Sequence, residues 1–164
     1  MITPLPSAFP TGRRPARAAA VLLAMLMLAG CHARSAEPKV AHAWVRLPAI
    51  AGQPAAAYFT IIGGRSDERL IQVESAVAQR VELHESMGGS GGMGSMAGMK
   101  PLDGLDVPAG ATIVFAPGGK HAMVYGVEKV VTPGTAIPLR FGFASGKTAE
   151  AEAKTVAAGD DAPY

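Results

Sequence analysis

Short runs of alternating or continuous hydrophobic residues, separated by turn signals, follow one another along most of this sequence. Residues 149–154 are the clearest example, because alanine alternates there with charged residues. A period of two puts one set of side chains on a buried face and the other in solvent, which indicates a β-strand. Residues 55–62 are instead mostly apolar between Pro54 and Gly63, a pattern typical of a buried strand inside a sandwich.

The same patterns predict roughly eight strands, at residues 40–47, 55–62, 70–77, 81–84, 111–115, 121–127, 136–143 and 149–154. Strict alternation in the first of them places Val40, His42 and Trp44 on one face. The chain also contains 20 Gly and 13 Pro, which favour frequent turns over a helical bundle. We therefore predict an all-β fold, a cupredoxin-like or Ig-like Greek-key β-sandwich in a single domain.

Residues 1–36 have the pattern of an export signal. Three arginines precede an apolar run at 18–29, which is shorter than the roughly 20 residues needed to span a bilayer. The run ends in Leu28-Ala29-Gly30-Cys31, which resembles the bacterial lipobox and predicts a lipid on Cys31. The alternative is cleavage after Ala33 or Ser35, which would release a soluble periplasmic protein. Either way we expect an exported, periplasmic protein whose contact with a membrane is limited to a lipid at Cys31.

The remaining chain divides into a sandwich domain at 37–157 and a short tail at 158–164. From Glu37 onward there are eleven basic and thirteen acidic side chains, a net charge of −2. No cluster of Lys and Arg remains of the kind that binds nucleic acid, so no nucleic-acid partner is expected.

The one cysteine, Cys31, lies at the end of the signal. An intramolecular disulfide, a cysteine zinc site and a blue-copper centre all need cysteines within the domain, so these classes are excluded. The sequence also lacks a nucleophile motif with a partnered histidine and a phosphate-binding glycine loop. We therefore do not expect an enzyme.

Histidine and methionine are the residues with an unusual distribution. Residues 86–98 consist only of Ser, Gly, Met and Ala, and Met99 follows directly. His84 precedes this stretch, and His121 and Met123 occupy positions that share one side of an extended segment. Thioether sulfur combined with imidazole nitrogen selects Cu(I) among biological metals, whereas zinc and calcium prefer thiolate, carboxylate or oxygen ligands.

Each of these residues, taken singly, is more often structural than functional. A histidine near a strand end is usually hydrogen-bonded structure, which is the interpretation we give to His42. A methionine facing a sandwich interior is ordinarily part of the core. The combination of two histidines and several methionines within 40 residues is what favours a copper site.

The sequence resembles the periplasmic copper-A chaperone (PCuAC) family, whose signature is His, ten residues, Met, twenty-one residues, His-x-Met. Residues 81–85 (VELHE) resemble its first-ligand segment, and 99–102 (MKPL) resemble its Met-Arg-Pro-Val segment. Residues 107–110 and 117–123 resemble its remaining blocks, and twenty-one residues separate Met99 from His121, as in the family. The likeness covers most of residues 40–157.

This resemblance implies a Cu(I) chaperone with the ligands His84, Met99, His121 and Met123. The implied recipient is the CuA site in subunit II of a haem-copper oxidase, and other periplasmic copper carriers are further potential partners. A periplasmic copper-buffering or resistance carrier is the alternative function, because it would use the same ligands. Both histidines must be unprotonated to bind a metal, so affinity should fall below about pH 6.5.

The chain departs from the signature in one gap, because fourteen residues instead of ten separate His84 from Met99. Loop-closure entropy rises slowly with length, so the site can tolerate the extra residues. Met96 is then a rival to Met99 as the ligand, and Met99 is preferred because it keeps the spacing to His121. Met87, Met93 and Met96 are candidates for additional soft donors that capture or hand over copper.

Overall fold

The computed structural model describes residues 36–87 and 98–164 as strands joined by turns. The strands are β1 (Lys39–Arg46), β2 (Ala55–Ile62), β3 (Glu68–Glu74), β4 (Arg80–Ser86), β5 (Met99–Leu102), β6 (Leu105–Val107), β7 (Thr112–Phe115), β8 (Lys120–Tyr125), β9 (Ala136–Phe143) and β10 (Thr148–Val156). This part of the chain contains no helix long and apolar enough to cross a membrane. Residues 1–35 of the predicted export signal, Cys31 among them, lie outside the described residues.

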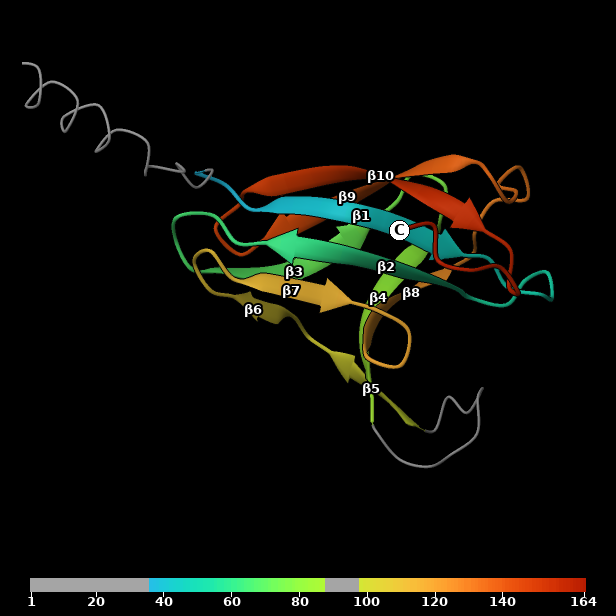
Figure 1. Ribbon diagram of the computed structural model, residues 1–164, viewed down its shortest axis with the longest axis horizontal. Helices are drawn as coiled ribbons and strands as arrows, with labels where there is room; N and C mark the ends of the chain where they lie inside the picture. Colours follow the sequence, from blue (N-terminus) through green and yellow to red (C-terminus); the bar gives the residue numbers. More distant parts are fainter. Residues whose placement is uncertain (1–35, 88–97) are drawn as a thin grey trace, which may run out of the picture. The chain divides into compact units, whose positions relative to one another are not determined.

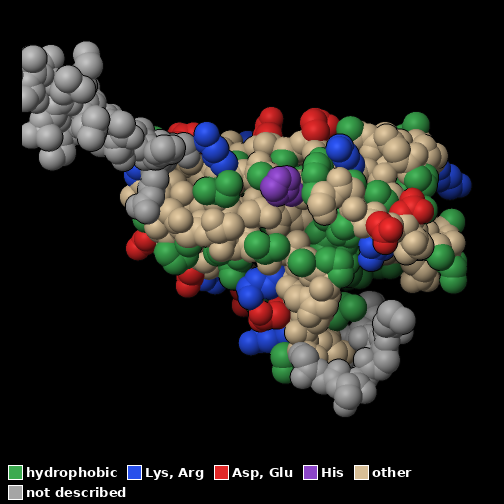
Figure 2. Space-filling view, viewed as in Figure 1, with side chains coloured by type: hydrophobic (Ala, Val, Ile, Leu, Met, Phe, Trp, Pro, Cys, Tyr) green, Lys and Arg blue, Asp and Glu red, His purple; other side chains and the backbone are tan. Residues whose placement is uncertain are grey.

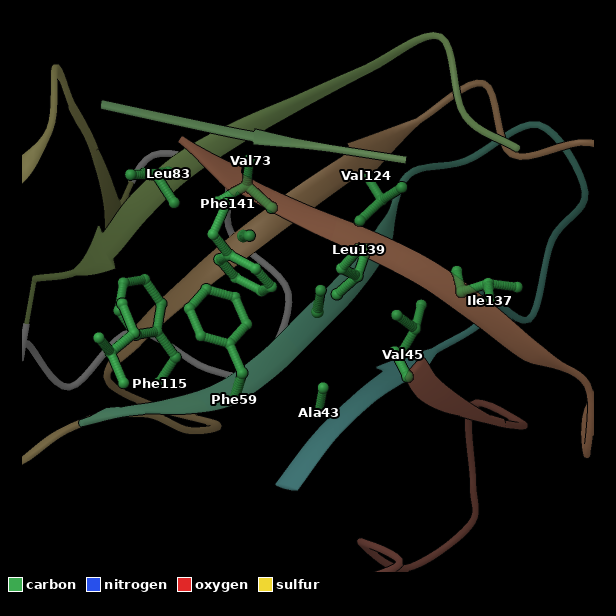
Figure 3. Packing of buried hydrophobic residues seen from close by; sticks show 14 of the residues in the cluster. Ala43, Val45, Phe59, Val73, Leu83, Phe115, Val124, Ile137, Leu139 and Phe141 are labelled. Carbon is green, nitrogen blue, oxygen red and sulfur yellow. The ribbon is translucent and has the colours of Figure 1, made fainter. Parts of the chain in front are cut away.

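All ten strands belong to one hydrogen-bonded sheet with the order β5-β4-β8-β2-β1-β10-β9-β3-β6, and β7 pairs with β2 (Figure 1). The first and last strands in sequence, β1 and β10, pair in parallel, and the other pairs are antiparallel. β2 pairs with β8 through residues 55–57 and with β7 through residues 59–62. The sheet folds over on itself, so β1 and β2 face β9 and β3 across the interior (Figures 1 and 3).

The core lies between these two layers, where Val45 and Phe59 meet Leu139 and Phe141 (Figure 3). The Phe59 ring stacks on Phe115 with centroids 4.2 Å apart and meets the edge of Phe141 at 4.8 Å. Such aromatic pairs add about 0.5–1.5 kcal/mol each beyond the burial of their surface. The predicted all-β sandwich is therefore confirmed.

Two short strands, β5 and β6, were not expected from the sequence. β5 contains Pro101, which lacks a backbone N–H and is tolerated in a sheet mainly at an edge. β5 and β6 do lie at the two ends of the strand order, and only residues 103–104 join them. Three or four residues on an edge carry too little hydrophobic pattern to be recognised in advance.

The prediction of strict alternation along β1 is wrong, because the strand contains a bulge. Ala41 pairs with Thr60, whereas Trp44 pairs with Tyr58, so β1 has one residue more than β2 over this interval. His42 takes up the difference with φ of 52°, a left-handed conformation that is uncommon for a residue other than glycine. The bulge reverses the faces, so Val40 packs against the main core cluster, whereas Trp44 is buried outside that cluster, against the Tyr58 ring.

Charged side chains of both signs are interspersed on the face of the molecule shown in Figure 2. This face carries no large area of a single sign, which agrees with the small net charge of the domain.

Candidate metal centre

His84 and His121 are direct cross-strand neighbours on β4 and β8. Directly paired residues project to the same face of a sheet, and here the two ring centroids are 5.9 Å apart. His121 is 5% exposed, and the side chain of His84 is 14% exposed. Two strands thus bring together two largely buried imidazoles that have 36 residues between them in the sequence.

Both candidate methionines share the face of these histidines. Met123 follows His121 by two residues on β8 and is 8% exposed, and Met99 begins β5 opposite Ser86, two residues beyond His84. Diagonal neighbours of this kind are typically about 7–8 Å apart at Cα, which a long thioether side chain spans. All four residues chosen from the sequence therefore lie on one face of β5, β4 and β8.

The other methionines of residues 86–98 do not share the position of Met99. Met87 follows the end of β4 and is 63% exposed. Met93 and Met96 lie outside the described residues. His42, which the sequence left as a structural histidine, is exposed on β1 and contacts the ring of Tyr164 with centroids 5.3 Å apart.

The ring nitrogens of the two histidines are the most informative feature of the site. His121 donates from Nδ1 to the Gly119 carbonyl at 3.0 Å, and its Nε2 is buried with no partner among the described residues. His84 points Nε2 at a Glu82 carboxylate oxygen at 3.4 Å, and its Nδ1 is buried and likewise without a partner in residues 36–87 and 98–164. A buried polar atom left unpaired costs about 1–3 kcal/mol. Two such atoms on adjacent rings suit a metal, because each is the nitrogen that keeps a free lone pair.

Glu82 is a residue of this site that the sequence analysis did not identify. Its Oε1 accepts from Nε of Arg80 at 3.0 Å, and the Arg80 guanidinium lies 3.9 Å from the centre of the Tyr125 ring. Partial burial acts to raise the pKa of Glu82, but hydrogen bonds with His84 and Tyr125 and the charge of Arg80 outweigh it and lower that pKa. The carboxylate is therefore ionised beside His84. The spacing Glu-x-His within a strand was the available signal, because residues two apart share a face.

Glu85 occupies the opposite face of β4. It accepts from Nζ of Lys120 at 2.6 Å, and this hydrogen bond lowers the pKa of Glu85. The two carboxylates that flank His84 in sequence thus have separate roles, since only Glu82 is directed at the histidine.

Within the described residues, no three His, Cys, Asp or Glu side chains come together in a group that could hold a metal ion. A metal held by His84 and His121 would thus have no third ligand of these four types among the described residues. The thioethers of Met99 and Met123 share the required face, and such sulfur donors suit Cu(I).

Solved structures with a similar fold are PCuAC domains. The copper-bound PCuAC domain from PmoF2 is 24% identical, with a TM-score of 0.57 over 72% of this chain and 91% of that domain. The Cu(I) form of DR1885 from Deinococcus radiodurans is 23% identical, with a TM-score of 0.56 over 80% of this chain and 85% of its own. The fold is therefore that of a PCuAC domain, as the sequence resemblance implied.

A protein from Leifsonia xyli subsp. xyli (strain CTCB07), named as a putative lipoprotein, is 30% identical over 110 residues. The match covers 67% of this chain and 64% of that relative, so it spans slightly less than two thirds of the relative's length. A family model described as "Putative lipoprotein LpqE-like" matches residues 39–155, which is nearly the whole strand-forming region. The chain belongs to the LpqE-like family.

Proposed function

We propose that this protein is a periplasmic Cu(I) chaperone that holds one copper ion with His84, Met99, His121 and Met123. The observation that carries the proposal is the pair of buried, unpartnered ring nitrogens on adjacent strands, with two thioethers on the same face. Copper-bound PCuAC domains with the same fold support it. The proposed role is to bind and pass on a metal ion, and it involves no catalysis.

The donor set suits reversible binding. Two neutral imidazoles and two neutral thioethers leave the charge of Cu(I) uncompensated by the ligands themselves, which weakens binding relative to a thiolate site. Met99 begins the edge strand β5 and is only half-buried, so this ligand lies where a partner can reach it. A copper ion could then be released from Met99 first and from the buried His121 and Met123 last.

We infer that the recipient is the CuA site in subunit II of a haem-copper oxidase, by the resemblance to the PCuAC family. The alternative is a carrier that buffers excess periplasmic copper with the same ligands. A deletion strain separates the two functions, because loss of oxidase activity at ordinary copper levels supports delivery. Sensitivity to copper with normal oxidase activity would support buffering instead.

We propose further that residues 1–36 direct export and that a lipid on Cys31 anchors the domain at 37–157. The name of the Leifsonia relative supports an anchored form. Labelled palmitate should enter the wild-type protein and not a Cys31→Ala variant. Absence of label from the wild-type protein would remove the anchor.

The metal site is tested by Cu(I) titration against a competing chelator. His121→Ala removes a buried nitrogen ligand. Because loss of an outer-shell partner alone typically lowers metal affinity about tenfold or more, losing this ligand should lower the Cu(I) affinity by at least about tenfold. His42→Asn is the matched control, because His42 is exposed on β1 and asparagine tolerates its positive φ. Equal affinity of His121→Ala and His42→Asn for Cu(I) would refute the ligand assignment.

We also propose that Met87, Met93 and Met96 act as transient donors during capture or handover. Replacing all three by leucine should slow transfer of Cu(I) to an acceptor while the equilibrium affinity stays near that of the wild type. If the transfer rate and the affinity are both unchanged in the triple variant, these methionines have no such role.

A further inference from the structure

Glu82 connects His84 to a second charged group outside the proposed ligand set. Its Oε1 accepts from Arg80 Nε at 3.0 Å, its Oε2 faces His84 Nε2 at 3.4 Å, and the carboxylate also hydrogen-bonds Tyr125. Arg80 is in turn held by its position over the Tyr125 ring. Arg80 and Tyr125 are themselves Cα partners across β4 and β8, so both strands that carry the histidines fix this arrangement.

We propose that Glu82 is a positioning residue that fixes the His84 ring so that copper binds Nδ1, whereas His121 binds copper through Nε2. This inference rests on the proposed function. A carboxylate can only accept, so it requires a proton on His84 Nε2 and leaves the lone pair on Nδ1. The Gly119 carbonyl imposes the opposite choice on His121, because it accepts from Nδ1. In both rings the nitrogen left over is the one that is buried without a partner.

The two histidines then differ in electronic character. His121 is held by a backbone carbonyl, whereas His84 is held by a side-chain carboxylate, the kind of outer-shell partner that orients a ligating ring and strengthens it as a donor to the metal. Glu82 also places a negative charge beside a donor set that is otherwise neutral. Loss of an outer-shell partner of this kind typically lowers metal affinity about 10- to 100-fold.

The first test uses the metal-free protein, so it does not depend on copper. Long-range ¹H–¹⁵N NMR spectra of the imidazole rings report which nitrogen carries the proton. We expect the proton on Nε2 in His84 and on Nδ1 in His121. A proton on Nδ1 of His84 would overturn the proposal, because that nitrogen could not then be the preformed ligand.

The second test compares Cu(I) affinity among variants, each checked for folding by its NMR spectrum. Glu82→Ala should lower the affinity about 10- to 100-fold. Glu82→Gln should lower it less, because the amide oxygen can still accept from Nε2 while the charge is gone. Glu85→Gln is the matched control, since it removes the same charge from the opposite face of the same strand. Equal losses in the Glu82 and Glu85 variants would show that only the overall charge matters and would refute positioning.

The coordinating nitrogen supplies a readout that a purely structural residue would not change. In the Cu(I)-loaded wild-type protein, His84 should retain its Nε2 proton and shift at Nδ1, and Glu82→Ala should lose this selectivity. Retention of Nδ1 coordination in Glu82→Ala would overturn the proposal. If the metal-free protein has the expected ring protons but binds no Cu(I), the chaperone function fails while the positioning of the ring by Glu82 stands.

Discussion

Gly63 is the position where a single added methyl group should most disturb the fold. It follows β2 directly and donates its N–H to the Ala111 carbonyl at 2.8 Å, and the next residue, Gly64, accepts from Gly110 N at 2.9 Å. A Cβ at Gly63 would overlap the Pro108 carbonyl oxygen and lie 3.0 Å from the Gly110 nitrogen. All of these are backbone atoms, so no side chain can rotate to make room. Gly63→Ala must therefore push the turn at 108–111 away from the end of β2.

The expected cost follows from the contacts that must move. Two backbone hydrogen bonds are at risk, at about 0.5–1.5 kcal/mol each, and overpacking a well-packed site costs about 1–3 kcal/mol. Replacing glycine also restricts the unfolded chain, which by itself raises the free energy of unfolding by about 0.4–1 kcal/mol. The free energy of unfolding should therefore fall by about 1–6 kcal/mol, a large share of the roughly 5–15 kcal/mol available to a typical domain.

Urea denaturation measures this change, with the fluorescence of Trp44 as the probe. Trp44 is the one tryptophan of the chain and is 5% exposed, so unfolding transfers it from the protein interior to water. Gly159→Ala is the matched control, because a Cβ at Gly159 meets nothing within 4 Å. If Gly63→Ala is within about 0.5 kcal/mol of Gly159→Ala, the ordinary range for a surface substitution, the close-approach argument is wrong.

Two further predictions concern the loop ligand and the acid stability. Met99→Leu should weaken Cu(I) binding in a chelator competition, while Met96→Leu should leave the equilibrium affinity unchanged, and the reverse result would make Met96 the ligand. Glu68, with a side chain only 4% exposed, accepts from Lys147 Nζ at 2.7 Å, and this hydrogen bond lowers the pKa of Glu68 below 4.5. The free energy of unfolding of the wild type should therefore exceed that of Glu68→Gln by its full amount above about pH 4.5. This difference should disappear as pH falls through the lowered pKa of Glu68. Urea midpoints of the two proteins between pH 7 and pH 3 test this, and a constant difference would contradict it.

Much of the fold could be predicted because its strands carry strong periodic patterns. The alternation at 149–154 and the apolar run at 55–62 correspond to β10 and β2. The bulge at His42 was invisible, because nothing in the local sequence requires an extra residue there, and the pairing of Ala41 and Trp44 with β2 creates it. Sheet register is a property of two strands together, so a pattern along one strand cannot reveal it.

The candidate site was predictable to the level of residue type and spacing. The His121-x-Met123 pair follows from the period of a strand alone, because both side chains must share a face. Which strand faces them does not follow from that period, and the direct pairing of His84 with His121 appears only in the structure. The role of Glu82 was missed for a related reason: a carboxylate two residues from a histidine is common, and only its contact with Nε2 distinguishes it.

The longer gap between His84 and Met99 is explained by where the strand pairing begins. Ser86 pairs with Met99, and Met87 N donates to the Gly98 carbonyl at 2.6 Å, so hydrogen bonding between the β4 and β5 segments extends as far as these residues. The extra residues of the fourteen-residue gap therefore belong to the connection and leave the ladder intact. Lengthening a closing segment from ten to fourteen residues costs only about 0.3 kcal/mol of closure entropy. The proposed ligand positions on β4 and β5 are set by strand register, so they do not depend on the length of this connection, and Met99 keeps the face that it shares with His84.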